Sequence, residues 1–99
     1  MKLGIFVNEL RGNEYMLGRL MAEKVGVFLV ENGIYHAMIK ENGGTSSVLQ
    51  KQGASYYCLL EDLQTRGLTP SDVESKVNVV SYEDVVNLMM NDYDKLIWL

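Results

Sequence analysis

The sequence predicts an α/β fold with three layers, in which helices cover both faces of a mostly parallel sheet of about five strands. Two observations support this fold class. Short, almost wholly apolar runs recur along the chain, as is typical of buried strands, and the segments between them show helical spacing instead of hairpin turns. Right-handed crossovers between parallel strands then place helices on both faces. The length of 99 residues fits one domain, which we expect to span residues 1–99.

The first half of the chain contains the two most apolar predicted strands. Residues 2–7 read Lys-Leu-Gly-Ile-Phe-Val, and residues 25–30 read Val-Gly-Val-Phe-Leu-Val. Between them, apolar residues recur at helical spacing over 16–21 and predict a short helix. Residues 34–39 predict a second short helix, and the glycines and hydroxyls of 42–47 predict a surface loop.

The third predicted strand, residues 55–59, is rich in aromatic side chains. It leads into a short helix over 60–66, which Gly67 ends because glycine is favoured just after a helix. Thr69 followed by Pro70 predicts one further helical turn, with a capping hydroxyl and a proline suited to the first turn.

A fourth strand over 77–80, a helix and a fifth strand over 95–99 complete the predicted sheet. Ser81 and Asp84 have the spacing of a capping box and predict the start of the helix. One face of this helix is expected to cover the sheet. Its predicted core stripe is Tyr82, Val85, Val86, Met89, Met90 and Tyr93.

The charge of the chain argues against nucleic acid as a direct partner. Nine Lys and Arg against thirteen Asp and Glu give a net charge of -4, so we expect no tight nucleic-acid binding. Residues 60–99 carry three basic and eight acidic side chains. These acids either form solvated helix faces or dock a basic partner, for which Glu83, Asp84 and Asp92 are candidates.

Several classes of protein do not fit the sequence. The start of the chain lacks the cleavage region of a signal peptide and the length of a membrane span, so we expect a soluble, cytoplasmic protein without membrane contact. Both glycine-rich nucleotide-binding motifs are absent, so no cofactor is expected. One histidine and one cysteine are too few soft ligands for a metal site, and the single cysteine cannot form an internal disulfide.

Candidate site residues follow the first three strands. In an open parallel sheet, ligands bind beyond the carboxyl ends of the strands, where the strand order reverses. A module that binds a small ligand there, through Asn8, Arg11 and the 42–47 loop, is one alternative for the function. The residues in question are Asn8, Glu9 and Arg11 after the first strand, Glu31 and Asn32 after the second, and Cys58 in the third.

Cys58 is the one side chain with nucleophilic chemistry of its own, and two roles are open for it. A nearby helix start and Arg66 would favour the thiolate, whereas Glu61 and Asp62 would raise the pKa of the thiol, and cysteine is often a small buried hydrophobe. His36 has no identifiable acid partner and is expected at the surface or at a subunit contact.

Four segments resemble the DsrE/DsrF/DsrH family of sulfur-relay proteins, and the DsrH (TusB) subgroup most of all. The Glu-Asp-Leu-x-x-Arg-Gly-Leu pattern at 61–68, with the strand and helix predicted after it, is fairly specific for the family. At Asn32 the sequence departs from the aspartate of the subgroup. The segments are 27–34 (Val-Phe-Leu-Val-Glu-Asn-Gly-Ile), 57–68 (Tyr-Cys-Leu-Leu-Glu-Asp-Leu-Gln-Thr-Arg-Gly-Leu), 77–88 (Val-Asn-Val-Val-Ser-Tyr-Glu-Asp-Val-Val-Asn-Leu) and 95–98 (Lys-Leu-Ile-Trp).

The resemblance implies a flavodoxin-like sheet and a small subunit of a sulfurtransferase complex. Its implied partners are DsrE-like and DsrF-like subunits and a sulfur-carrier protein. The implied pathway is either synthesis of 2-thiouridine at the tRNA wobble position or sulfur oxidation. The catalytic cysteine of a DsrE-type chain falls about one position from Cys58. The resemblance thus implies a mainly structural, partner-binding subunit, or a persulfide carrier through Cys58. Homo-oligomers are a further expectation, with Trp98 or Tyr35 near the contact, because the chain is 47% hydrophobic and ends in an apolar run.

Overall fold

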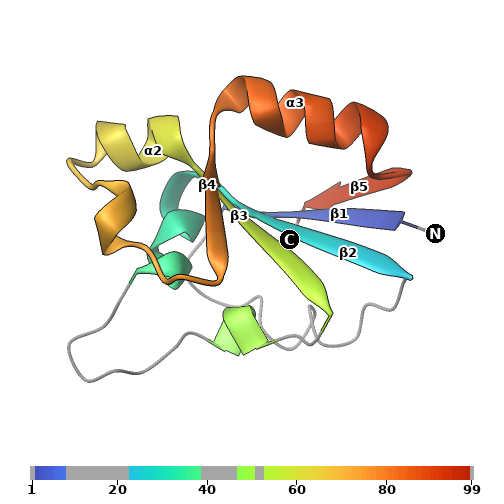
Figure 1. Cartoon of the computed structure of the whole chain (residues 1–99), viewed down its shortest axis with the longest axis horizontal. Coiled ribbons are helices and arrows are strands. Elements are labelled where there is room, and N and C mark those ends of the chain that lie inside the picture. The colour runs from blue at the N-terminus through green and yellow to red at the C-terminus, as the bar shows by residue number, and fades with distance from the viewer. Residues whose placement is uncertain (1, 9–22, 39–46, 51–52, 99) are drawn as a thin grey trace.

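A single parallel sheet of five strands forms the centre of the computed structural model, which describes residues 2–8, 23–38, 47–50 and 53–98. The sheet has the order β4-β3-β2-β1-β5, and every neighbouring pair is parallel (Figure 1). The α/β class and the five-stranded sheet are thereby confirmed, with strand ends within one residue of those predicted. The strands are β1 (Lys2–Val7), β2 (Lys24–Leu29), β3 (Ala54–Leu59), β4 (Val77–Val80) and β5 (Lys95–Trp98).

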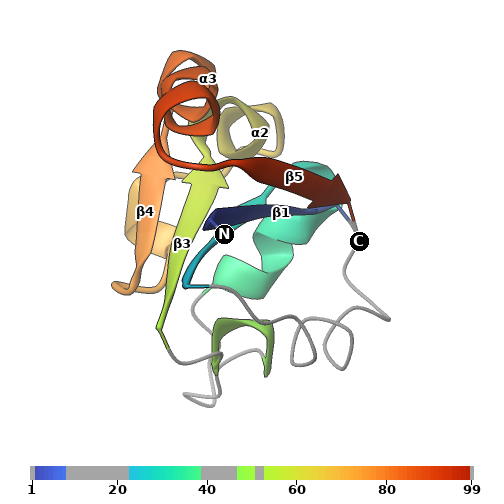
Figure 2. The ribbon, with the colours of Figure 1, turned by 90° about the vertical axis from the view of Figure 1, so that its right-hand side faces the viewer.

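The strand order determines which face each connection covers. The chain steps in one direction from β1 to β4 and then returns past β1 to form β5, and right-handed crossovers therefore place the last connection on the opposite face. That last connection is α3 (Tyr82–Asn91), which lies on one side of the sheet while η1 and η2 lie on the other (Figures 1 and 2). The other helical elements are η1 (Glu31–Ala37), η2 (Ser47–Gln50), α2 (Leu60–Thr65) and η3 (Pro70–Asp72).

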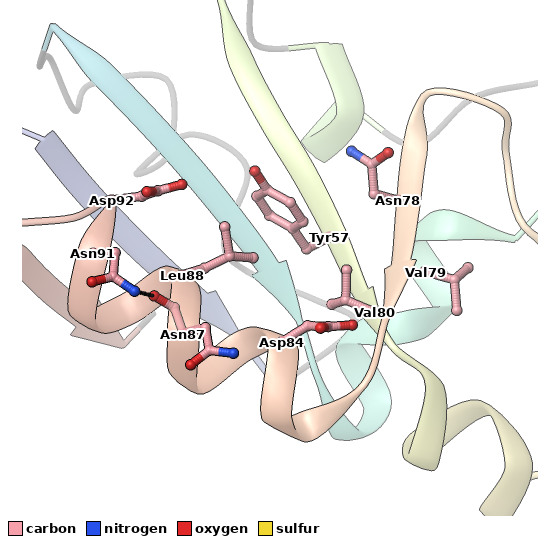
Figure 3. Close-up of a pocket in the computed structure, with 9 residues that line it drawn as sticks. All are labelled: Tyr57, Asn78, Val79, Val80, Asp84, Asn87, Leu88, Asn91 and Asp92. Atoms are coloured by element: carbon pink, nitrogen blue, oxygen red, sulfur yellow. Dashed lines mark hydrogen bonds between the residues drawn. The ribbon is translucent and has the colours of Figure 1, made fainter.

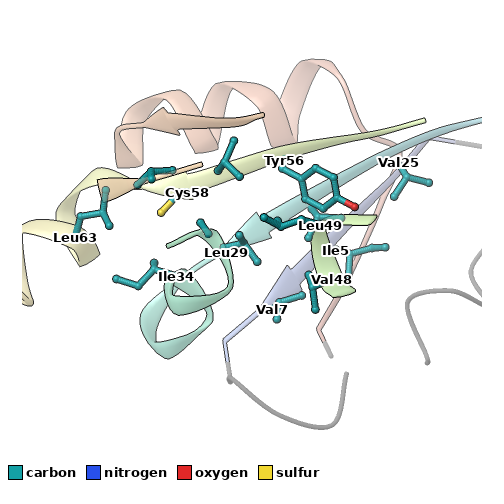
Figure 4. Packing of buried hydrophobic residues seen from close by; sticks show 14 of the residues in the cluster. Ile5, Val7, Val25, Leu29, Ile34, Val48, Leu49, Tyr56, Cys58 and Leu63 are labelled. Atoms are coloured by element: carbon teal, nitrogen blue, oxygen red, sulfur yellow. The ribbon is translucent and has the colours of Figure 1, made fainter. Parts of the chain in front are cut away.

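Two hydrophobic cores, one on each face of the sheet, hold these layers together. The first core cluster joins one face of the strands to η1, η2 and α2, through side chains such as Ile34, Leu49 and Leu63 (Figure 4). The second core cluster joins the other face to α3 and consists of Phe6, Phe28, Val30, Val85 and Tyr93. Strands buried on both faces explain why β1 and β2 are apolar runs without alternation.

An aromatic row crosses four strands beneath α3. Phe6 of β1 stacks on Trp98 of β5 with a centroid distance of 4.6 Å and on Phe28 of β2 at 5.1 Å. Phe28 in turn stacks on Tyr57 of β3 at 5.0 Å. These residues are direct register partners in the parallel ladder, so the stacking fixes the register of the sheet as well as contributing burial.

The predicted capping signals of the helices are present. Ser81 and Asp84 form the expected capping box at the start of α3. Gly67 ends α2 with φ 71°, and the N–H of Leu68 donates to the carbonyl of Leu63 at 2.9 Å while the Gly67 N–H donates to Gln64. This pair of bonds is a Schellman motif, which satisfies the last carbonyls of the helix.

The predicted core stripe of α3 is only partly correct. Val85 and Tyr93 are buried and Met89 packs against the second core cluster, but Tyr82 is 65% exposed and Met90 79% exposed. Leu88, which the stripe omits, packs against the cluster instead. Successive residues of a helix are separated by 100°, so a helix that turns Leu88 toward the sheet turns Met90 away from it.

The structure modifies or leaves open three other predicted elements. The helix predicted over 34–39 is a 3₁₀ helix that begins earlier, at Glu31. The helix predicted over 16–21 and most of the loop predicted over 42–47 lie outside the described residues. None of the helices in the described part of the chain is long and apolar enough to cross a membrane.

Candidate functional site at the carboxyl ends of the strands

Two of the predicted site residues meet beyond the carboxyl ends of β2 and β3. Arg66, which follows α2, donates from Nη2 to the Oδ1 atom of Asn32 in η1 at 3.2 Å. Asn8 is half-buried at the end of β1. Glu9 and Arg11 lie outside the described residues, so the structure does not place the whole predicted set.

Asp62 connects α2 to the start of η1. Its carboxylate accepts the backbone N–H of Glu31 at 2.6 Å and lies 3.8 Å from the Nη1 atom of Arg66. Glu31 has φ 51°, a left-handed conformation that is unusual for a residue with a side chain. The hydrogen bond that the Glu31 N–H donates to Asp62 therefore helps to hold Glu31 in a conformation that it would otherwise seldom adopt.

The neighbouring carboxylate of Glu61 connects α2 to α3. Its two oxygens lie 3.1 and 3.2 Å from the backbone nitrogen of Tyr82, the first residue of α3, and accept that N–H. Two consecutive acids thus fix the beginnings of two elements that follow different strands. From the sequence, these acids were considered for their charge near Cys58 and as part of the 61–68 pattern. Nothing in the sequence indicates the distant backbone N–H groups from which their carboxylates accept hydrogen bonds.

Cys58 lies in the first core cluster with its sulfur close to α2 and η1 (Figure 4). The residue is 0% exposed. Burial, and secondarily the charge of Asp62, raises the pKa of the Cys58 thiol from 9.0 to about 12. Arg66, which was expected to favour a thiolate, pairs with Asp62 instead. At neutral pH the side chain is therefore an uncharged thiol in an apolar site.

His36 corrects the expectation that this side chain lies at the surface. It is only 3% exposed, in a 3₁₀ helix packed against the sheet. A 3₁₀ helix has three residues per turn, so Gly33 and His36 share one side of η1. That side faces the sheet, because a Cβ atom at position 33 would collide with the carbonyl of Val7.

An apolar groove opens at the carboxyl edge of the sheet, between β5, β1 and α3. Trp98, expected near a contact between chains, forms part of this groove and is 61% exposed although its ring stacks on Phe6. Tyr35, the other residue expected there, is 39% exposed in η1 and outside the groove. The groove has a volume of about 370 Å³ and is lined by Phe6, Val30, Glu31, Leu59, Asp62, Tyr82, Val85, Val86, Met89, Leu96 and Trp98.

A second, more polar cavity of about 660 Å³ lies between α3 and the neighbouring strands β3 and β4 (Figure 3). Asn78, Asn87 and Asn91 supply most of its amide groups. Two of the acids predicted to dock a partner line it, but both have internal contacts. Asp84 accepts a hydrogen bond from the Ser81 N–H at 3.2 Å, and Asp92 lies 3.7 Å from the Nζ atom of Lys24.

Within the described residues, no group of three or more His, Cys, Asp or Glu is placed to hold a metal ion.

The comparisons with known proteins agree with this architecture. Residues 14–95 match the family described as DsrH like protein. The chain is 30% identical over 83 residues to Protein TusB from Photorhabdus laumondii subsp. laumondii, with 84% of each chain covered.

Two solved structures share the fold at 18% identity. The Methanobacterium thermoautotrophicum protein MTH1491, described as a protein of unknown function, has a TM-score of 0.74 with 99% of this chain and 98% of that chain covered. The Thermotoga maritima protein Tm0979 has a TM-score of 0.61, with 90% and 93% covered. The chain therefore belongs to the DsrH-like family, a membership that supports its assignment as a subunit of a sulfur-relay complex.

Proposed function

We propose that this chain serves its sulfur-relay complex as a structural and partner-binding subunit, and that Cys58 carries no sulfur. The observation that carries the proposal is the position of the Cys58 sulfur, which is buried in the first core cluster. A sulfur carrier must present a thiolate to a donor, and here burial raises the pKa of the thiol to about 12.

The partners in this proposal are DsrE-like and DsrF-like subunits in the cytoplasm. Similarity to a Protein TusB favours sulfur transfer toward 2-thiouridine at the tRNA wobble position over sulfur oxidation. The acidic chain supports an indirect role toward tRNA, since its net charge of -4 opposes capture of a phosphate backbone. The RNA would be bound elsewhere in the assembly.

Reconstitution of the complex with a Cys58→Ala chain tests the proposal. The chain is assembled with the DsrE-like and DsrF-like chains of the same genome, and the rate of sulfur transfer from a persulfide donor is measured. We expect the Cys58→Ala complex to assemble and to transfer sulfur at the wild-type rate, whereas replacement of the DsrE-type catalytic cysteine abolishes transfer. A loss of transfer with Cys58→Ala in an intact complex would establish instead that the chain is a persulfide carrier.

A further inference from the structure

The apolar groove lies on the α3 side of the sheet and is open to solvent. Phe6, Leu96 and Trp98 line it from the strands, and Tyr82 and Met89 line it from α3. Trp98 and Tyr82 are both more than half exposed. Large exposed aromatic side chains around a concave apolar surface are typical of a protein interaction site.

Internal contacts already hold parts of the groove in place in the unbound chain. The Trp98 ring stacks on Phe6 with an interplanar angle of 22°, and Phe6 is itself part of the aromatic row. The Tyr82 backbone is held by the Glu61 carboxylate. Because the Trp98 ring and the Tyr82 backbone are fixed by internal contacts, less additional ordering is needed on binding.

The opposite wall of the groove is acidic. Glu31 and Asp62 line it, and Glu61 contacts the lining residue Tyr82. Arg66 pairs with Asp62, its Nη1 atom lying 3.8 Å from the carboxylate. Within the part of the chain that the structure describes, the Glu31 carboxylate has no cationic partner.

The apolar lining and the acidic wall together indicate which chemical groups the groove would bind. A bulky apolar side chain would fill the cavity, and a neighbouring lysine or arginine would meet the acidic wall. A second copy of this chain fits less well, because a symmetric contact through the groove would bring the same acidic wall against itself.

We propose that the apolar groove binds a segment of another subunit of the sulfur-relay complex, which inserts a bulky apolar side chain flanked by a lysine or arginine. This inference rests on the proposed function and adds to it the surface by which the chain joins its complex.

Binding measurements with single variants test the groove. The probe is the complex of DsrE-like and DsrF-like chains from the same genome, and its affinity for this chain is measured by isothermal titration calorimetry. Trp98→Ala and Tyr82→Ala should each weaken binding about tenfold or more, as expected for buried aromatic anchors. Met90→Ala is the matched control, because Met90 is an exposed apolar residue of α3 outside the groove, and its affinity should stay within about twofold of wild type. Circular dichroism establishes that each variant is folded.

The charge of the acidic wall is tested separately. Glu31→Gln should weaken binding about three- to fivefold at low salt and flatten the dependence of affinity on salt. Glu74→Gln, between η3 and β4 and outside the groove, is the control and should leave both unchanged.

Three other outcomes would overturn the inference, and the binding measurements distinguish them from one another. If the wild-type chain does not bind the partner subunits, the proposed function fails and the groove proposal fails with it. If the wild-type chain binds and Trp98→Ala and Tyr82→Ala bind equally well, only the groove proposal fails. If Trp98→Ala instead dissociates a homodimer of this chain without changing the affinity for the partners, the groove holds a second copy and the proposal is wrong.

Discussion

Gly26 of β2 lies directly beneath the ring of Tyr93, so that a Cβ atom at position 26 would overlap the tyrosine hydroxyl and the adjacent ring carbon. Tyr93 follows α3 and packs edge-on against Phe28, with a centroid distance of 5.7 Å. The absence of a side chain on β2 therefore allows the end of α3 to pack closely against the sheet.

Gly26→Ala should destabilise the chain by about 2 kcal/mol, because a buried aromatic ring must move to admit the methyl group. The measurement is the free energy of unfolding from urea titration. Gly4→Ala is the matched control, since Gly4 pairs with Gly26 in register but its nearest neighbour is the flexible end of the Leu96 side chain. A loss for Gly26→Ala no larger than that for Gly4→Ala would contradict this account of Tyr93.

The link from Glu61 to Tyr82 should also be measurable as stability. Glu61→Ala removes an acceptor from the first N–H of α3 and should cost about 1 kcal/mol, the usual worth of a helix cap. Glu83→Ala removes an acid near the same helix end without removing this bond, and should cost less. Equal urea midpoints for the two variants would show that the Glu61 contact adds nothing beyond its charge.

Gly67 provides a test of the end of α2. Its φ of 71° is readily adopted by glycine, and no atom lies near the position that a Cβ would occupy. Gly67→Ala should therefore lower the free energy of unfolding by about 1 kcal/mol through backbone conformation alone. Gly67→Asn should lose less than Gly67→Ala, because asparagine tolerates the left-handed conformation better than alanine does. Thermal unfolding of both variants decides the point.

The buried thiol of Cys58 should make the chain less stable in alkali. Its pKa is about 12 in the folded chain and 9.0 in the unfolded reference, so the thiol contributes stability below pH 9 that is lost as the pH rises toward 12. Between pH 8 and pH 10 the loss from this group should be roughly 1 kcal/mol. Urea titrations at the two pH values should show a larger drop for wild type than for Cys58→Ala. Equal drops would mean that the thiol ionises normally in the folded chain.

Local signals in the sequence predicted most of the fold. The apolar runs fixed the strands to within one residue, and Ser81 and Gly67 marked the ends of α3 and α2 as the structure has them. The place of β5 beside β1 was beyond such reasoning, because it depends on a contact between Phe6 and Trp98 from opposite ends of the chain.

The candidate site was less accessible from the sequence. His36 was expected at the surface because no acid partner could be identified for it, whereas the 3₁₀ helix η1 turns this side chain toward the sheet. The exposed Tyr82 had the spacing of a core residue, and only the packing of α3 on the sheet showed that it lines the groove.

The central claim, that this subunit supports sulfur transfer without carrying sulfur, is tested most directly by intact mass spectrometry. The chain, assembled with its DsrE-like and DsrF-like partners, is incubated with a persulfide donor, and the mass of each subunit is then recorded. The buried position of Cys58 predicts that the DsrE-type subunit gains sulfur while this chain keeps its unmodified mass. Addition of one sulfur atom to this chain, lost in Cys58→Ala, would contradict the account.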